Sequence, residues 1–260
     1  MIPRIFTHCL VVLAALTAVL GTPTRSAAAD AAKPQYYELR VYTTQSEAQQ
    51  QRINDYWQNA AVPAYNRMGI KPVGVFTEME ASATNKVYVL IPCDSVEVFA
   101  AIPAKLAADA DYQKAAAEFL SAPKSNPAYD RIESSFLVAF DGMKHLVAPG
   151  QQATIFELRT YKSPSEGVGL NKIKMFESGE ITVMKEVGLA PVFYGRTLIG
   201  ANMPCLTYMT CGETADEHKK HWSGFGAAPI WKQLQADPQY KDNMIGMIKV
   251  MLKRTGASQI

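Results

Sequence analysis

The sequence Tyr-Glu-Leu-Arg-Val-Tyr at residues 37–42 returns as Phe-Glu-Leu-Arg-Thr-Tyr at residues 156–161, an offset of 119 residues. Two further motifs recur at the same offset: Ser46-Glu47 as Ser165-Glu166, and Gly-Ile-Lys-Pro-Val at 69–73 as Gly-Leu-Ala-Pro-Val at 188–192. A constant offset across three separated motifs indicates two copies of one structural unit. We expect a first unit over residues 30–145, a linker over 146–153 and a second unit over 154–260.

Hydrophobic periodicity predicts the same order of elements in both copies. In the first copy, alternation predicts a strand over 36–43, and apolar residues three or four positions apart predict a helix over 46–68 that Pro63 should kink. The rest of the first copy is predicted to form strands over 71–80 and 87–92, a helical region over 95–120 and a strand over 132–140. The second copy is predicted to form strands over 154–161, 191–199, 205–211 and 245–254, with helical segments between them. In the second copy's first helix, only Glu180 interrupts the apolar positions.

The order β-α-β-β-α-β, found twice, is typical of ferredoxin-like units and predicts an α+β protein. Helices cover only one face of such a sheet, so the other face must be buried against another surface. We therefore expect the two sheets to face each other, with the helices outside.

The repeated Glu-Leu-Arg-x-Tyr strand, the Gly-[Ile/Leu]-x-Pro-Val motif and Ala-Asp-Pro-x-Tyr at residues 236–240 together resemble the NIPSNAP family. The resemblance covers both copies and implies a pseudo-symmetric barrel of the dimeric α/β-barrel group, built from two ferredoxin-like units. That group includes cofactor-independent oxygenases and haem enzymes. The resemblance supplies no catalytic residue set for this chain.

Charged residues alternate with apolar ones along the two repeated strands. Glu38, Arg40 and Tyr42 share one face, and their counterparts in the second copy share the equivalent face: Glu157, Arg159 and Tyr161. Because an unpaired buried charge is costly, we expect these groups to form a polar network. We place that network between the two facing sheets, with the polar end of a ligand cavity as the alternative.

A ligand site, if one exists, is expected in the second copy. Counting from Cys93 to Asp109 and from Cys211 to Asp237 suggests that the second copy carries ten extra residues, which include residues 221–226. Aromatic side chains and an arginine could bind a molecule there. The candidate ligand-binding residues are Tyr194, Arg196, His221, Trp222 and Phe225.

His218 and His221 lie three residues apart in a predicted helix. A solvated, charged helix face is the simpler interpretation. The alternative is a metal or haem site, for which Cys211, Glu213 or Glu217 would be the nearest third ligands. No HExxH, paired CxxC, GxGxxG or GxxxxGK[ST] motif occurs, so we assign no metal and no cofactor.

The first 29 residues have the layout of a secretory signal peptide. Arg4 precedes an apolar run over residues 9–20, and Ala27-Ala28-Ala29 supplies small residues before Asp30. Cleavage would export the protein to the periplasm or out of the cell and leave no stable membrane span. A mitochondrial presequence is the alternative. The mature chain would keep Cys93, Cys205 and Cys211, an odd number, so at least one would be unpaired within the chain.

Composition narrows the function without fixing it. The chain has 260 residues, 48 % hydrophobic and 19 % charged, with a net charge of +2 that becomes zero without residues 1–29. A neutral body argues against nucleic acid as a partner. We expect a module that binds a small, mostly apolar ligand. Two other classes compete with it: a cofactor-independent oxygenase or isomerase, and a structural or oligomerisation protein without a pocket. A homo-oligomer is compatible with each of these.

Overall fold

Eight antiparallel strands close into a barrel in the order β1-β3-β2-β8-β5-β7-β6-β4. The computed structural model describes residues 33–80 and 85–260. The strands are β1 (Tyr36–Thr43), β2 (Gly74–Glu78), β3 (Lys86–Cys93), β4 (Arg131–Ala139), β5 (Ile155–Lys162), β6 (Ala190–Ile199), β7 (Cys205–Gly212) and β8 (Gly246–Arg254). The first half of the molecule contributes β4-β1-β3-β2 and the second half β8-β5-β7-β6, and the pairs β4–β6 and β2–β8 join them.

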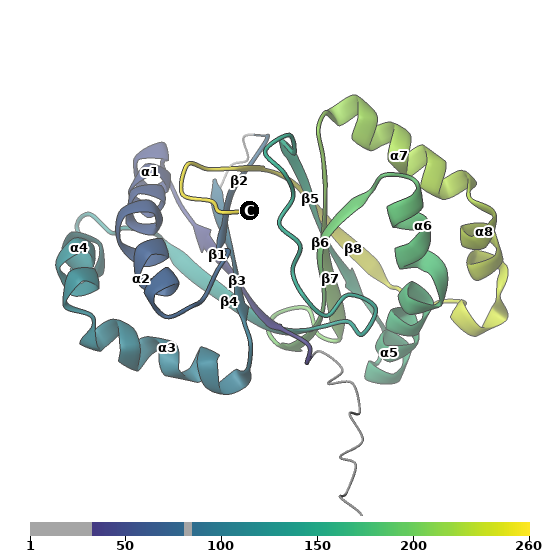
Figure 1. Ribbon diagram of the computed structural model, residues 1–260, viewed down its shortest axis with the longest axis horizontal. Coiled ribbons are helices and arrows are strands. Elements are labelled where there is room, and N and C mark those ends of the chain that lie inside the picture. Colours follow the sequence, from purple (N-terminus) through teal and green to yellow (C-terminus); the bar gives the residue numbers. More distant parts are fainter. Residues whose placement is uncertain (1–32, 81–84) are drawn as a thin grey trace, which may run out of the picture. The chain divides into compact units, whose positions relative to one another are not determined.

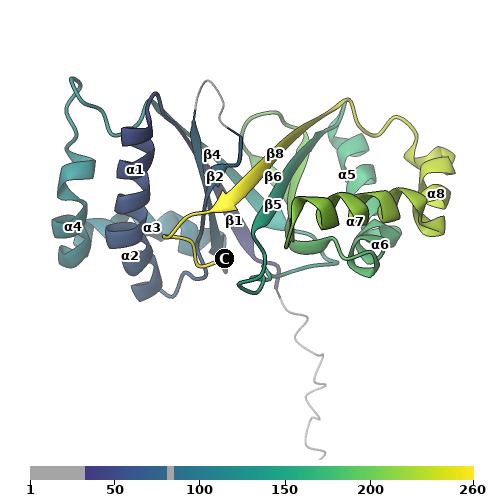
Figure 2. The ribbon, with the colours of Figure 1, turned by 90° about the horizontal axis from the view of Figure 1, so that it is seen from above.

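The helices lie outside the barrel, with α1 to α4 on one side and α5 to α8 on the opposite side (Figures 1 and 2). The α-helices are α1 (Glu47–Tyr56), α2 (Val62–Arg67), α3 (Val96–Ala108), α4 (Ala110–Leu120), α5 (Glu166–Met175), α6 (Ile181–Glu186), α7 (Ala215–Ala227) and α8 (Pro229–Ala236). Two π-helical segments, η1 (Trp57–Ala61) and η2 (Phe176–Glu180), and one 3₁₀ segment, η3 (Pro238–Tyr240), complete the helices. None of the helices in the described ranges is both long and apolar enough to cross a membrane.

The repeated motifs start and stop the first helical segment of each half. The hydroxyls of Ser46 and Ser165 accept hydrogen bonds from backbone N–H groups at the starts of α1 and α5, which is the usual role of an N-cap serine. Gly69 and Gly188 follow the ends of α2 and α6 with φ of +81° and +87°. Glycine is favoured at this position because it adopts the left-handed conformation without steric cost.

The π-helical segments are part of the repeat and not a consequence of Pro63. Segment η1 lies just before Pro63, where a kink was expected, and interrupts the helix between α1 and α2. The second half has η2 at the same offset, although Thr182 stands there in place of the proline. The irregularity therefore belongs to the architecture of both halves.

The polar network does not lie between the sheets, and that expectation was wrong. Tyr37 and Leu39 point into the barrel, where apolar residues from all eight strands pack. The aromatic ones are Tyr37, Phe76, Tyr88, Phe156 and Phe193. Glu38, Arg40 and Tyr42, and likewise Glu157, Arg159 and Tyr161, lie on the opposite face, beneath the helices. A closed barrel brings its inner faces together without water, so apolar side chains fill it and charges are excluded.

The second half contains no insertion around residues 221–226, contrary to expectation. Helices α3 and α7 each have 13 residues and lie at the common offset of 119. Asp109 and Asp237 had been treated as equivalent, but Asp109 caps α4 whereas Asp237 caps η3, after α8. The expectation failed because both elements, α4 and η3, have an aspartate as their N-cap although they are not equivalent in the two halves.

One end of the barrel is closed by the last residues of the chain. The N–H groups of Thr255 and Gln259 donate to the carbonyls of Val75 and Val73, and Ile260 is 1 % exposed and packs in the barrel interior (Figure 1). Cys93, Cys205 and Cys211 are buried and form no disulfide. The predicted signal peptide lies outside the described residues.

Candidate functional site

Helix α7 brings two polar side chains onto the buried carboxylate of Glu157. His218 and Trp222 are four residues apart, so both face β5. Nε2 of His218 lies 2.5 Å from Glu157 Oε2, and the indole N–H of Trp222 donates to the same oxygen at 2.6 Å. Arg159 donates to the other carboxylate oxygen at 2.7 Å. Glu157 is 2 % exposed and thus fully enclosed by these partners.

The partners keep Glu157 ionised. Burial alone would raise the pKa of this carboxyl, but His218, Arg159 and Trp222 together outweigh burial and lower it to about 2. The guanidinium of Arg159 also lies 3.5 Å from the centre of the Trp222 ring, within cation–π range. Glu157, Arg159, His218 and Trp222, here called the β5–α7 cluster, therefore form a fixed and charged group.

A second buried ion pair lies beside this cluster. Lys172 of α5 donates to Glu180 of η2 at 2.9 Å, and both side chains are almost completely buried. The lysine Nζ lies about 5–6 Å from the ring centres of Tyr161, Phe176 and Trp231. Burial raises the pKa of Glu180, although Lys172 opposes the effect. The pair is thus held where desolvation of both charges is costly.

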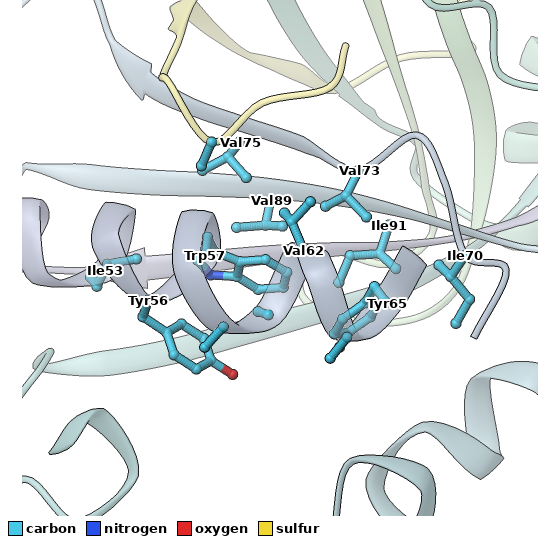
Figure 3. Close-up of a cluster of buried hydrophobic side chains, with 14 of the residues drawn as sticks. Ile53, Tyr56, Trp57, Val62, Tyr65, Ile70, Val73, Val75, Val89 and Ile91 are labelled. Carbon is cyan, nitrogen blue, oxygen red and sulfur yellow. The ribbon is translucent and has the colours of Figure 1, made fainter. Parts of the chain in front are cut away.

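The first half has apolar residues at the same positions. At the offset of 119, Ile53 stands where Lys172 stands and Ala61 where Glu180 stands, and both lie in an apolar cluster around Trp57 (Figure 3). Likewise Phe99 and Pro103 replace His218 and Trp222. Glu38 keeps only the partners available on the sheet: Arg40 at 2.9 Å and the hydroxyl of Ser134 at 2.7 Å.

Four of the five candidate ligand-binding residues lie in or beside the apolar cluster beneath α7. Tyr194 is completely buried and stacks on Tyr208, and Trp222 and Phe225 pack edge to face. The ring of His221 lies over Gly188, where any side chain would collide with it. These side chains pack against their neighbours, so the expected aromatic-walled ligand cavity does not form around them.

The two histidines of α7 have separate environments. His218 is buried against Glu157, which corrects the expectation of a solvated helix face. His221 contacts Gly188 instead. Within the described ranges, no group of three His, Cys, Asp or Glu side chains could hold a metal ion.

Arg196, the fifth candidate, lies in an open groove along α5. Two adjoining hollows of about 260 and 280 Å³ share Leu170, Ile173 and Arg196. The first is lined mainly by apolar residues: Leu170, Ile173, Leu198, Met203 and Pro204. The Arg196 side chain is exposed and makes no hydrogen bond or ion pair with any described residue.

This α5 groove is also specific to the second half. At the common offset, the first half has Gln51, Asn54 and Thr77 in place of Leu170, Ile173 and Arg196. The two apolar side chains and the cation of the groove therefore correspond to three uncharged polar residues in the other copy, of which Thr77 is buried. Sequence reasoning selected Arg196 but missed Lys172. Comparing the two copies position by position would have found it.

The described residues form a mixed α/β fold, a closed barrel of eight antiparallel strands covered by helices. Two solved structures named "putative monooxygenase" share this fold. The protein from Fusobacterium nucleatum is 12 % identical, with a TM-score of 0.56 over 85 % of this chain and 93 % of that chain. The protein from Lactobacillus acidophilus is 8 % identical, with a TM-score of 0.58 over 85 % of this chain and 94 % of that chain.

The family model that matches is NIPSNAP, over residues 37–141. The match lies in the first half of the chain, and the resemblance inferred from the sequence is confirmed there. A NIPSNAP family protein from Agrobacterium tumefaciens is 19 % identical over 41 % of this chain and 93 % of that chain, with a TM-score of 0.35. No curated protein matches the sequence.

Proposed function

We propose that this protein binds a small, mostly apolar molecule that carries a carboxylate, and that the α5 groove is the site. The observation that carries the proposal is the free guanidinium of Arg196 between two hollows whose walls are mostly apolar, although Glu166, Asp141 and Glu177 also line them. Leu170 and Met203 of the groove are 51 % and 44 % exposed, so a ligand would cover apolar surface now in water. Arginine recognises carboxylates through paired, charge-assisted hydrogen bonds.

Decanoate is a suitable probe, and decanol is its matched control because it has the same chain without the charge. We expect calorimetric titration to show that decanoate binds more tightly than decanol. Arg196→Met should weaken decanoate binding about tenfold or more, since a hydrogen bond to a charged group contributes about 1.5–3 kcal/mol, and should leave decanol unchanged. Arg52→Met on α1 is the control variant. Equal binding of decanoate by wild type and Arg196→Met would contradict the proposal.

A second candidate is a cofactor-independent oxygenase or isomerase of the barrel group. It is favoured by the buried Glu157–His218 pair, whose polar atoms lie 2.5 Å apart, and by the two neighbours named as monooxygenases. An oxygen electrode tests the oxygenase form with anthrone as the probe, since a solved structure that shares this fold is named an anthrone oxidase-like protein. Oxygen uptake by wild type that His218→Phe abolishes would support the oxygenase, and no uptake would contradict the oxygenase form for this probe.

We further infer that each half is a ferredoxin-like unit and that the mature protein is exported, beginning near Asp30. The strand order 4-1-3-2 within each half supports the first inference. The basic start, apolar run and small residues of 1–29 support the second. N-terminal sequencing of the protein from its source cell tests the cleavage: a chain that still begins at Met1 would contradict it.

A homo-oligomer is also proposed, and size-exclusion chromatography with light scattering tests it.

A further inference from the structure

A second cavity, of about 140 Å³, lies inside the barrel at the end opposite the C-terminal residues. Its walls come from the ends of strands in both halves, among them Val41 of β1, Thr160 of β5 and Cys205 of β7. The residues that close the other end contact the start of β2 instead. We call this cavity the barrel mouth.

The cavity exists because interior side chains change in size along the barrel. Near the closed end, Tyr37, Phe76, Phe156 and Phe193 fill the interior with rings. At the barrel mouth several of the lining side chains are small: Val41, Thr160, Thr197, Cys205 and Thr207. Protein interiors are normally close-packed, so a run of small side chains facing one another leaves usable space.

The two walls of the barrel mouth differ in chemistry. The first half supplies the neighbouring pair Val41 and Tyr88, and the second half supplies Thr160 and Thr207 at the same offset. The two threonine hydroxyls lie 2.9 Å apart. When one donates to the other, the acceptor still has a proton to donate, and both oxygens can accept further bonds. At these matched positions the first half is thus apolar and aromatic, whereas the second half offers a hydroxyl donor and acceptor.

We propose that the barrel mouth binds an uncharged, single-ring phenol. A cavity of about 150 Å³ accommodates benzene in an engineered protein, so 140 Å³ suits one ring. Leu39, Leu158 and Val250 pack around the ring, and its hydroxyl exchanges hydrogen bonds with the Thr160–Thr207 pair. The rim carries one charge of each sign, Lys86 and Glu133, so it does not select an ion.

The probes are 4-fluorophenol and 4-fluorotoluene, which have similar size and differ in the hydroxyl group. Binding is measured by fluorine NMR titration of the full chain. We expect wild type to bind both, and 4-fluorophenol more tightly. Thr160→Val/Thr207→Val removes both hydroxyls at nearly constant shape. It should weaken the binding of 4-fluorophenol about fivefold, the effect of one neutral hydrogen bond, and leave the binding of 4-fluorotoluene unchanged.

A rim variant tests the location without altering the core. Ile248 of β8 lines the barrel mouth and is 39 % exposed. Ile248→Trp should therefore obstruct the cavity and weaken the binding of both probes at least tenfold. Ile230→Trp on α8, at a similarly exposed position outside the barrel mouth, is the matched control. Two results would overturn the proposal. One is no detectable binding of either probe to wild type at probe concentrations up to about 10 mM. The other is binding that Ile248→Trp does not change.

The same titration separates this site from the α5 groove. Arg196→Met should weaken the binding of decanoate and leave the binding of both fluorinated probes unchanged. Equal losses of the two probes in the double threonine variant would disprove the role of the hydroxyls. Loss of 4-fluorophenol binding in Arg196→Met would place the phenol in the groove and overturn the assignment to the barrel mouth.

Discussion

The two halves of this molecule share one architecture and differ in what lies between sheet and helices. Both have an N-cap serine, a π-helical segment and a left-handed glycine at equivalent positions. The first half fills the space beneath its helices with an apolar cluster around Trp57 (Figure 3). The second half buries Lys172, Glu180 and the β5–α7 cluster in the same place. Both halves keep the Glu–Arg pair of their first strand, Glu38–Arg40 and Glu157–Arg159. The comparison therefore shows that the fold itself does not require the Lys172–Glu180 pair or His218.

Buried ion pairs are not an efficient source of stability. The free-energy cost of desolvating two charges often equals or exceeds the gain from their attraction. A protein with an apolar pair of similar volume in their place can be as stable or more stable. The first half demonstrates such an apolar solution with Ile53 and Ala61. Retention of Lys172 and Glu180 in the second half therefore points to a role in specificity or chemistry, and the first half supplies the substitutions that test it.

The largest effect is expected from removing one partner of the ion pair. Lys172→Ile installs the first half's residue but leaves Glu180 buried without a cation. We expect the free energy of unfolding to fall by about 3–5 kcal/mol, as for other broken buried pairs. Urea denaturation followed by circular dichroism measures the change.

The matched variant is Lys172→Ile/Glu180→Ala, which installs both residues of the first half. It should recover most of the loss, because no uncompensated charge remains, although Ala61 belongs to a differently packed cluster. A double variant no more stable than the single variant would show that the second half depends on these charges for folding, and the comparison between the halves would fail.

Acid pH should expose the contribution of Glu157. Its pKa in the folded protein is about 2, below the ordinary value of 4.5. A depressed carboxyl pKa stabilises the fold above the unfolded-state value and loses that contribution as pH falls from about 4.5 toward 2. The loss should reach at most about 3 kcal/mol, at about 1.4 kcal/mol for each pKa unit. Glu157→Gln should lack this part of the pH dependence.

Urea denaturation at several pH values between 2 and 7 measures this difference. The raised pKa of Glu180 acts in the opposite direction, because its destabilising charge is removed as pH falls. The comparison is therefore made in the Lys172→Ile/Glu180→Ala background. Parallel curves for the proteins with and without Glu157→Gln would show that the β5–α7 cluster does not hold the carboxylate as described.

The sequence predicted the architecture well because its signals are local. Serine caps, left-handed glycines and alternating strands are determined by neighbouring residues, and their repetition at one offset identified both halves. The face of β1 and β5 that points inward could not be predicted from alternation, since charged residues on either face would need partners. His218 supplies the partner of Glu157 from 61 residues away. The barrel mouth depends on the combined sizes of side chains from separate strands, which no single motif reveals.

The smallest expected effect concerns two hydroxyls that only the second half pairs. Tyr161 and Tyr208 are buried, and their hydroxyl oxygens lie 2.8 Å apart. The first half has Val89 where Tyr208 stands, and the hydroxyl of its Tyr42 accepts from Arg40 at 3.5 Å. Tyr208→Phe should lower the free energy of unfolding by about 1 kcal/mol, since it removes one neutral hydrogen bond. Tyr42→Phe, its control, should cost less.

A double-mutant cycle with Tyr161→Phe and Tyr208→Phe isolates the pair. After the first substitution, the second removes no hydrogen bond between the rings, so the double variant should lose about 1 kcal/mol less than the sum of the single losses. Arg159 also donates to the hydroxyl of Tyr161, at 3.3 Å, and this bond makes Tyr161→Phe the costlier single change. Additive losses in urea denaturation would mean that the tyrosine hydroxyls act independently, and the Tyr161–Tyr208 pair would then not distinguish the second half from the first.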